Sequence, residues 1–266
     1  MRQQRQAFEY RVTAKNDVPD SWNPIHRDDY ARSLGYPGGL VAGVTLYAFA
    51  ADAAIRALGA DWLERGYGAI EFRRPVFDGE ELAIRAEPVG EADWRITLSR
   101  DGLRAEALAG PYREEIRVDD LERDDTVEPQ VLVKDAAMTG ALLKRADDRT
   151  YTRPELEHFL AAAGLEGTPL AAALLSRGLV PPSVLAALPF TLLWRNYPYS
   201  VVIHTASATE WVSPARLGRT LYSWGRVEEA RERKGRFFVT QRVLTVDSEG
   251  TVVARMLHTG AYEPSR

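Results

Sequence analysis

Cysteine is absent from this chain of 266 residues, and histidine is scarce, with four residues. Without a thiol the chain can form no disulfide, no thiolate nucleophile and no cysteine-ligated zinc site. The four histidines never fall close together in the sequence: His26, His158, His204 and His258. This spacing argues against a metal site, although ligands distant in sequence can converge in space. We therefore expect neither a metal nor a redox cofactor.

The chain also lacks an excess of basic residues and a long apolar run. Its 34 Lys and Arg face 38 Asp and Glu, for a net charge of −4, so it has no general nucleic-acid-binding footprint. The longest apolar runs carry Arg or Asp within any window long enough to span a membrane. The first ten residues, MRQQRQAFEY, contain no apolar signal core. These absences predict a cytoplasmic protein without nucleic-acid or membrane partners.

What the sequence does contain is an internal repeat at a fixed offset of 139 positions. Gly39-Leu40-Val41 matches Gly178-Leu179-Val180, and residues 69–75 (AIEFRRP) match residues 208–214 (ATEWVSP). Because the offset holds across separate blocks, chance is a poor explanation. The repeat predicts two copies of one domain, with a first unit at 1–115, a charged linker at 116–130 and a second unit at 131–266. Each unit then has a common domain size.

One buried helix is predicted in each unit. Residues 41–58 are almost all small or apolar, which favours a helix, and a helix apolar on every side is a buried one. The only charged residues in this stretch are Asp52 and Arg56. Residues 182–197 are the apolar counterpart in the second unit, with Pro182 suited to a first turn. Two further helices are predicted at 27–34 and 153–163, the latter with Thr152 as its N-cap.

Strand-like alternation accounts for most of the remaining sequence. The predicted strands are 7–15, 67–73, 81–88, 94–100, 103–112, 131–133, 201–211, 220–228, 236–246 and 251–262. Asp101-Gly102 marks a hairpin, and the charged run 228–236 predicts a solvated hairpin extension. A long antiparallel sheet around one buried helix is the hotdog arrangement. The sequence thus predicts an α+β fold of two such units, a tandem double hotdog.

The strongest chemical motif is Asn23-Pro24-Ile25-His26, followed by Gly39-Leu40-Val41-Ala42-Gly43. It resembles the MaoC-like family, which includes (R)-specific enoyl-CoA hydratases and has the signature Asp-x-Asn-Pro-x-His before a Gly-led buried helix. The match extends in order and spacing from residue 7 to about residue 112. The resemblance implies a hydro-lyase that adds or removes water across the double bond of a 2-enoyl thioester. The substrate would be a small acyl thioester, enoyl-CoA more than a protein-bound acyl chain.

The resemblance also assigns roles to individual residues. His26 would be general base and acid on the water, Asp20 its acidic partner, and the Gly43 N–H would hold the thioester oxygen. A helix N-terminus offers unpaired N–H groups to a developing oxyanion, and histidine exchanges protons near neutral pH. Asn23 and Pro24 would aim His26, and Ser21 would help to shape the site.

One position departs from the family pattern. The family aspartate lies five residues before the histidine, where this chain has Ser21. Either a one-residue insertion lets Asp20 fill the role, or the acid is lost, since Asp17 lies further back still. Two alternatives stay open: a non-catalytic protein that binds acyl thioesters, and a thioesterase whose only candidate acid is Asp52.

The second unit carries no copy of the motif. By the repeat offset His26 corresponds to Leu165, and Asp20 corresponds to Phe159. The sequence therefore predicts one working site, in the first unit, with the second unit supporting it or covering the substrate channel. A homodimer of double hotdogs is left open.

Overall fold

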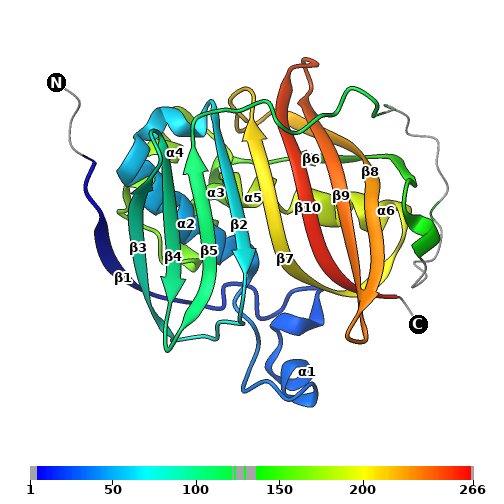
Figure 1. The fold of residues 1–266 in the computed structure, drawn as a ribbon, viewed down its shortest axis with the longest axis horizontal. Helices are drawn as coiled ribbons and strands as arrows, with labels where there is room; N and C mark the ends of the chain where they lie inside the picture. Colours follow the sequence, from blue (N-terminus) through cyan, green and yellow to red (C-terminus); the bar gives the residue numbers. More distant parts are fainter. Residues whose placement is uncertain (1–4, 122, 124–128, 130–135, 265–266) are drawn as a thin grey trace.

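The computed structural model describes residues 5–121, 123, 129 and 136–264 of the chain. A single antiparallel sheet dominates it, with the strand order β1-β3-β4-β5-β2-β7-β10-β9-β8-β6. Figure 1 views this sheet nearly face-on, with the helices α2 to α6 behind it and α1 beyond its lower end. None of the helices in the described ranges is long and apolar enough to cross a membrane.

The first half of the sheet contains the five strands predicted for the first unit. They are β1 (Phe8–Thr13), β2 (Gly66–Phe72), β3 (Glu81–Val89), β4 (Asp93–Ser99) and β5 (Leu103–Gly110). Alternate residues face the core: Ile84, Ile96 and Leu98 are almost completely buried, while their neighbours are partly or fully exposed. Asp101 and Gly102 both adopt positive φ in the turn between β4 and β5, as their sequence predicts.

The second half contains β6 (Leu142–Thr150), β7 (Tyr199–Trp211), β8 (Thr220–Arg233), β9 (Arg236–Asp247) and β10 (Val252–Pro264). The charged hairpin extension is confirmed, because β8 and β9 stay paired as far as Arg233 and Arg236. Strand β6 was not predicted. It is a mostly polar edge strand paired only with β8, so it lacks the alternation that marks a half-buried strand. The strand predicted at 131–133 lies outside the described residues.

The two halves join through β2 and β7, which pair antiparallel with Ala69 opposite Ala208. These two residues are equivalent under the repeat offset, so a local two-fold axis passes between them. Two isolated bridges, Leu40 with Phe77 and Leu179 with Arg216, are equivalent in the same way. The repeat in the sequence is therefore a repeat in the fold.

Helix α2 (Gly43–Leu58) forms the centre of the first half, and its residues from Thr45 to Ile55 are all buried. The other helices are α1 (Asp28–Ser33), α3 (Arg153–Ala162), α4 (Pro169–Arg177), α5 (Pro182–Leu185) and α6 (Leu188–Asn196). Short 3-10 turns occur at η1 (Pro24–His26), η2 (Ala60–Leu63) and η3 (Ala136–Met138). Thr152 caps α3 as predicted, in a reciprocal capping box with Glu155.

The prediction of one continuous helix over 182–197 is wrong. The segment forms α5 and α6, separated at Ala186 and Ala187. Pro189 lies in the first turn of α6; it has no N–H to bond the Leu185 carbonyl in a continuous helix, and its ring would clash with that carbonyl. Helix α4 was not predicted, and its N-terminal Leu170 N–H is bonded by Asp52 of α2.

Candidate functional site

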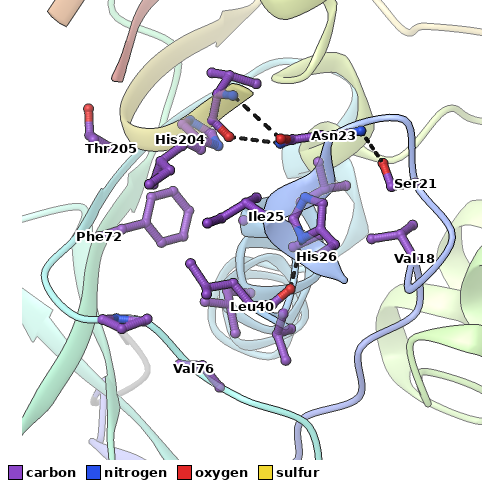
Figure 2. Close-up of a pocket in the computed structure, with 18 of the residues that line it drawn as sticks. Val18, Ser21, Asn23, Ile25, His26, Leu40, Phe72, Val76, His204 and Thr205 are labelled. Atoms are coloured by element: carbon purple, nitrogen blue, oxygen red, sulfur yellow. Dashed lines mark hydrogen bonds between the residues drawn. The ribbon is translucent and has the colours of Figure 1, made fainter. Parts of the chain in front are cut away.

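A cavity of about 390 Å³ lies beside the start of α2. Four segments form most of its wall: the loop from Asp17 to His26, residues 40–46 at the entry to α2, residues 72–76 at and beyond the end of β2, and residues 202–205 of β7. The remaining lining residues are Tyr36, Phe159, Phe190 and Arg236. Figure 2 shows the loop of Asn23 and His26 on one side and Phe72 and His204 on the other. Both halves of the sheet therefore contribute to one site.

His26 ends the short turn η1, which Pro24 begins. Its Nδ1 lies 2.7 Å from the Leu40 carbonyl oxygen. A carbonyl only accepts, so Nδ1 carries the proton and Nε2 keeps a free lone pair. Burial lowers the pKa of His26, while the Leu40 carbonyl and the nearby Asp17 act in the opposite direction. The ring is thus neutral near pH 7 and able to accept a proton at Nε2.

Asn23 holds this turn against the second half of the molecule. Its buried amide donates to the Val202 carbonyl at 2.7 Å and accepts from the Val202 N–H at 3.4 Å (Figure 2). The Asn23 N–H in turn donates to Ser21 Oγ at 3.2 Å. Ser21 and Asn23 both line the cavity, and Asn23 connects the turn that carries His26 to β7.

The acid in the cavity wall is Asp17, whereas Asp20, to which the resemblance gave the acidic role, lies outside that wall. Asp20 is exposed and is not among the residues of the cavity wall. The Ser21 N–H donates to the Val18 carbonyl at 3.0 Å, which closes a turn with Pro19 and Asp20 at its outer corner. Pro-Asp-Ser is favourable turn chemistry, and this was the available signal that the Asp20 side chain would face solvent.

Asp17 is held by the first turn of α2. Its Oδ1 accepts from Thr45 Oγ1 at 2.7 Å. Burial raises the pKa of Asp17, and the Thr45 hydrogen bond partly opposes that rise, as does His26 when its ring is protonated. A carboxyl with a raised pKa beside a neutral histidine can exchange protons with a substrate in the same cavity.

Gly43 is the first residue of α2, so its N–H has no partner within the helix. A side chain at this position would be tightly packed, because an added Cβ would lie 3.0 Å from His204 Nδ1 and 3.1 Å from His204 Cβ, and His204 would have to shift slightly. The imidazole of a β7 residue therefore packs directly on the start of α2. Glycine at position 43 is explained by that contact, whatever its N–H binds.

His204, which lines the cavity, belongs to a chain of polar side chains that runs into the core and that was not predicted. His204 Nε2 lies 2.5 Å from Ser207 Oγ, which lies 3.1 Å from His258 Nδ1. Phe190 contacts both rings edge-on. Burial lowers the pKa of His204 to about 3, despite the opposing Ala206 carbonyl, and it also lowers the pKa of His258 well below its usual value. The register that places Ser207 opposite His258 creates this chain.

Asp52 lies away from the cavity. Its Oδ1 accepts from the Leu170 N–H at 3.0 Å, and its Oδ2 accepts from Tyr10 at 3.1 Å and Arg56 at 2.8 Å. All of these contacts are structural, and they connect α2 to α4 and β1. The acid on which the thioesterase alternative depended is therefore not placed near His26.

Comparison with known proteins identifies the fold. No family model and no curated protein matches the sequence. Among solved structures, a protein described as a MaoC-domain dehydratase from Chloroflexus aurantiacus J-10-fl matches with a TM-score of 0.62 and 13% identity, over 98% of this chain and 95% of its own. A conserved hypothetical protein of Mycobacterium tuberculosis, described as a double hotdog fold, matches at 0.60 and 16%, over 98% and 96%.

A protein described as a thioesterase from Novosphingobium aromaticivorans DSM 12444 also matches, at a TM-score of 0.53 and 15% identity, over 97% of this chain and 96% of its own. The predicted double hotdog is thus confirmed, and MaoC-like dehydratase proteins are among the structures that share it. Because dehydratases and thioesterases share this fold, the fold alone does not decide the reaction.

Proposed function

We propose that this protein is a hydro-lyase that adds or removes water across the double bond of a 2-enoyl thioester. The observation that carries the proposal is the meeting of three groups in one cavity. His26 offers Nε2 as an acceptor, Asp17 is a half-buried carboxyl group, and Gly43 is the first residue of a helix, where its N–H has no partner within the helix. The neighbouring structure described as a MaoC-domain dehydratase supports it at the level of the fold.

In the hydration direction, His26 Nε2 accepts a proton from the attacking water as the water oxygen bonds to C3 of the enoyl group. The electrons of the double bond move toward the thioester oxygen, where the Gly43 N–H and the helix dipole stabilise the developing negative charge. The proton held on His26 then passes to C2, so that one water has been added overall. Asp17 accepts a hydrogen bond from the second hydrogen of the water, which stays on the oxygen, and so orients that oxygen toward C3. The reverse sequence of steps gives dehydration.

The two alternatives are less well supported. The thioesterase reading required Asp52, whose oxygens are occupied by structural contacts outside the cavity. The non-catalytic reading rested on the missing family aspartate, and Asp17 supplies a carboxyl group to the same cavity from a different position in the loop.

The decisive experiment follows a short 2-enoyl-CoA by loss of its enoyl absorbance and, separately, by release of free thiol. The wild type is expected to hydrate the substrate without releasing thiol. His26→Ala is expected to reduce hydration by roughly 10²–10⁴-fold, because it removes the general base. Thiol release without hydration, or hydration unaffected by His26→Ala, would contradict the proposal.

A further inference from the structure

Asn16 lies at the base of the loop that carries Asp17. Its half-buried side chain donates from Nδ2 to the His26 carbonyl at 2.8 Å. Its Oδ1 accepts from the Val18 N–H at 3.4 Å, so the donor and the acceptor of the amide each face a matching group. The residue next to Asp17 in the chain is thus bonded directly to His26.

The backbone of Asn16 is anchored to the turn before β3. Its N–H donates to Asp78 Oδ1 at 2.8 Å. Two residues earlier, Ala14 donates to the Glu80 carbonyl at 2.8 Å and accepts from the Gly79 N–H at 2.9 Å. Because the start of the loop is held by these bonds, the Asn16 side chain reaches the histidine turn from a fixed point.

The His26 carbonyl that Asn16 binds is enclosed by Gly39. A Cβ at position 39 would overlap the carbonyl and would lie 3.0 Å from Asn16 Nδ2, so no side chain fits there. The Leu40 carbonyl in turn accepts from the His26 ring at 2.7 Å (Figure 2). Both the backbone and the ring of His26 are therefore held by short contacts.

The second unit shows that the fold does not need this arrangement. Gly178 corresponds to Gly39 by the repeat offset, but it follows α4 in a left-handed conformation, with open space around its Cβ position. Glu155 corresponds to Asn16 and takes part in the cap of α3 instead. At these positions, all of them within the described ranges, only the unit with polar groups in the cavity makes the contact.

We infer that Asn16 is a positioning residue that fixes the Asp17 carboxyl group relative to the His26 ring. The two groups are close enough for Asp17 to raise the pKa of His26. The Asp17 carboxylate is already held by Thr45 at 2.7 Å, so the remaining freedom is that of the loop relative to His26, and Asn16 removes it. The inference rests on the proposed function, in which both groups act on one water. A misplacement of about 1 Å in such a site can cost roughly 100-fold in rate.

An NMR titration of the His26 ring in the full chain tests the inference without turnover. A negative neighbour favours the imidazolium, so Asp17→Asn is expected to lower the pKa of His26. In the Asn16→Ala background the same substitution should lower that pKa by only about half as much or less, because the two groups are no longer held together. Asn16→Ser, which keeps a turn-forming side chain too short to reach the carbonyl, should behave in the same way.

Hydration of a short 2-enoyl-CoA gives a second readout. Asn16→Ala is expected to lower kcat by roughly 10–100-fold and to change KM by about twofold or less, because the contacts with the substrate remain. Asn196→Ala is the matched control. The Asn196 amide also donates to a carbonyl, that of Leu192 at 2.9 Å, but it lies outside the cavity wall. This variant should leave kcat and the effect of Asp17 on the pKa of His26 unchanged.

The two readouts separate the inference from the proposed function. If Asn16→Ala weakens the effect of Asp17 on His26 in a protein that hydrates no enoyl thioester, the positioning role stands and the hydro-lyase proposal fails. An effect of Asp17 that is absent in the wild type, or that persists in both Asn16 variants, would overturn the inference. So would an equal loss of that effect in Asn196→Ala, or an unchanged kcat in an Asn16 variant that has lost it.

Discussion

The two units of this molecule share their framework and differ around the helix start. Both units make the same isolated bridge between the segment before the helix and the segment after the next strand. At the positions of Asp17 and His26, however, the second unit has Leu156 and Leu165, which are only 3% and 1% exposed. One copy places polar groups in a cavity, and the other fills the equivalent positions with core. The comparison separates residues that build a hotdog from residues that give it chemistry.

The helices differ in the same way. Helix α2 runs unbroken from Gly43 to Leu58, while its counterpart begins at Pro182 and is divided into α5 and α6. Only the first unit thus presents the N-terminus of a long, buried helix to a cavity. The second unit contributes instead from its strands, with Val202 bonded to Asn23 and His204 packed on Gly43.

The largest expected effect is the difference in hydration rate between substitutions of the two loop aspartates, Asp17 and Asp20. Asp17→Asn should reduce the hydration rate by roughly 100-fold or more, because it removes the carboxylate that orients the water. Asp20→Asn should leave the rate within about twofold, because that side chain is exposed and outside the cavity. Initial rates with a short 2-enoyl-CoA measure both. Equal losses in the two variants would show that the placement of the acid is misassigned.

The next largest effect is on stability. It concerns Leu165, which in the second unit occupies the position of His26 in the first. Leu165→Ala should lower the free energy of unfolding by about 2–5 kcal/mol, because it leaves a cavity in the core. His26→Ala, at the equivalent position, should cost only about 1 kcal/mol through loss of its hydrogen bond to Leu40. Urea unfolding of both variants tests the difference. A larger loss for His26→Ala would mean that the histidine is primarily a structural residue.

The two helix starts provide a smaller, third contrast. Gly43→Ala forces a contact with His204 and should destabilise the fold by about 1–3 kcal/mol while lowering the hydration rate. The added substitution His204→Ala should recover part of the stability by making room. Pro182→Ala, at the equivalent position of the second unit, should leave the rate unchanged and shift stability by about 1 kcal/mol or less. Kinetics and thermal unfolding of the four proteins would distinguish steric from chemical roles of Gly43.

The smallest effect concerns pH. Burial lowers the folded-state pKa of His204 and His258, so the unfolded chain binds protons more readily than the folded one. Their contribution to stability is complete above the ordinary histidine pKa near 6.5 and is lost as the pH falls toward 3. His258→Leu should therefore make stability less steeply dependent on pH between about 6.5 and 4. Denaturant midpoints across this range, with His158→Gln as the control, measure the slope; an unchanged slope would contradict the assignment.

Much of the fold could be predicted because its patterns are strong. Helix α2 is too apolar and too rich in alanine to lie anywhere but in a core, and the strands of the first unit alternate clearly. Strand β6 and the break at Pro189 escaped prediction for opposite reasons. Strand β6 has too little apolar alternation to be recognised without its pairing to β8. The segment around Pro189 is so apolar that its pattern predicts one helix, although the proline prevents a continuous one.

The candidate site was only partly predictable for similar reasons. Asn23 and His26 belong to one short motif whose local turn fixes their relation. Whether Asp17 or Asp20 faces the cavity depends on the orientation of the turn between them. The spacing of residues along the chain does not determine that orientation. The chain of His204, Ser207 and His258 depends on the register between β7 and β10, which brings together residues more than 50 positions apart.

The pairing of Ala69 with Ala208 on a local two-fold axis has a consequence for how such a molecule can change. In a dimer of identical chains, symmetry imposes every substitution twice, once in each subunit. A replacement that improves packing in one copy would then remove a reactive group from the other. Here both copies belong to one polypeptide, so Leu165 and His26 can occupy equivalent places. Because the two halves belong to one chain, equivalent positions can carry different residues.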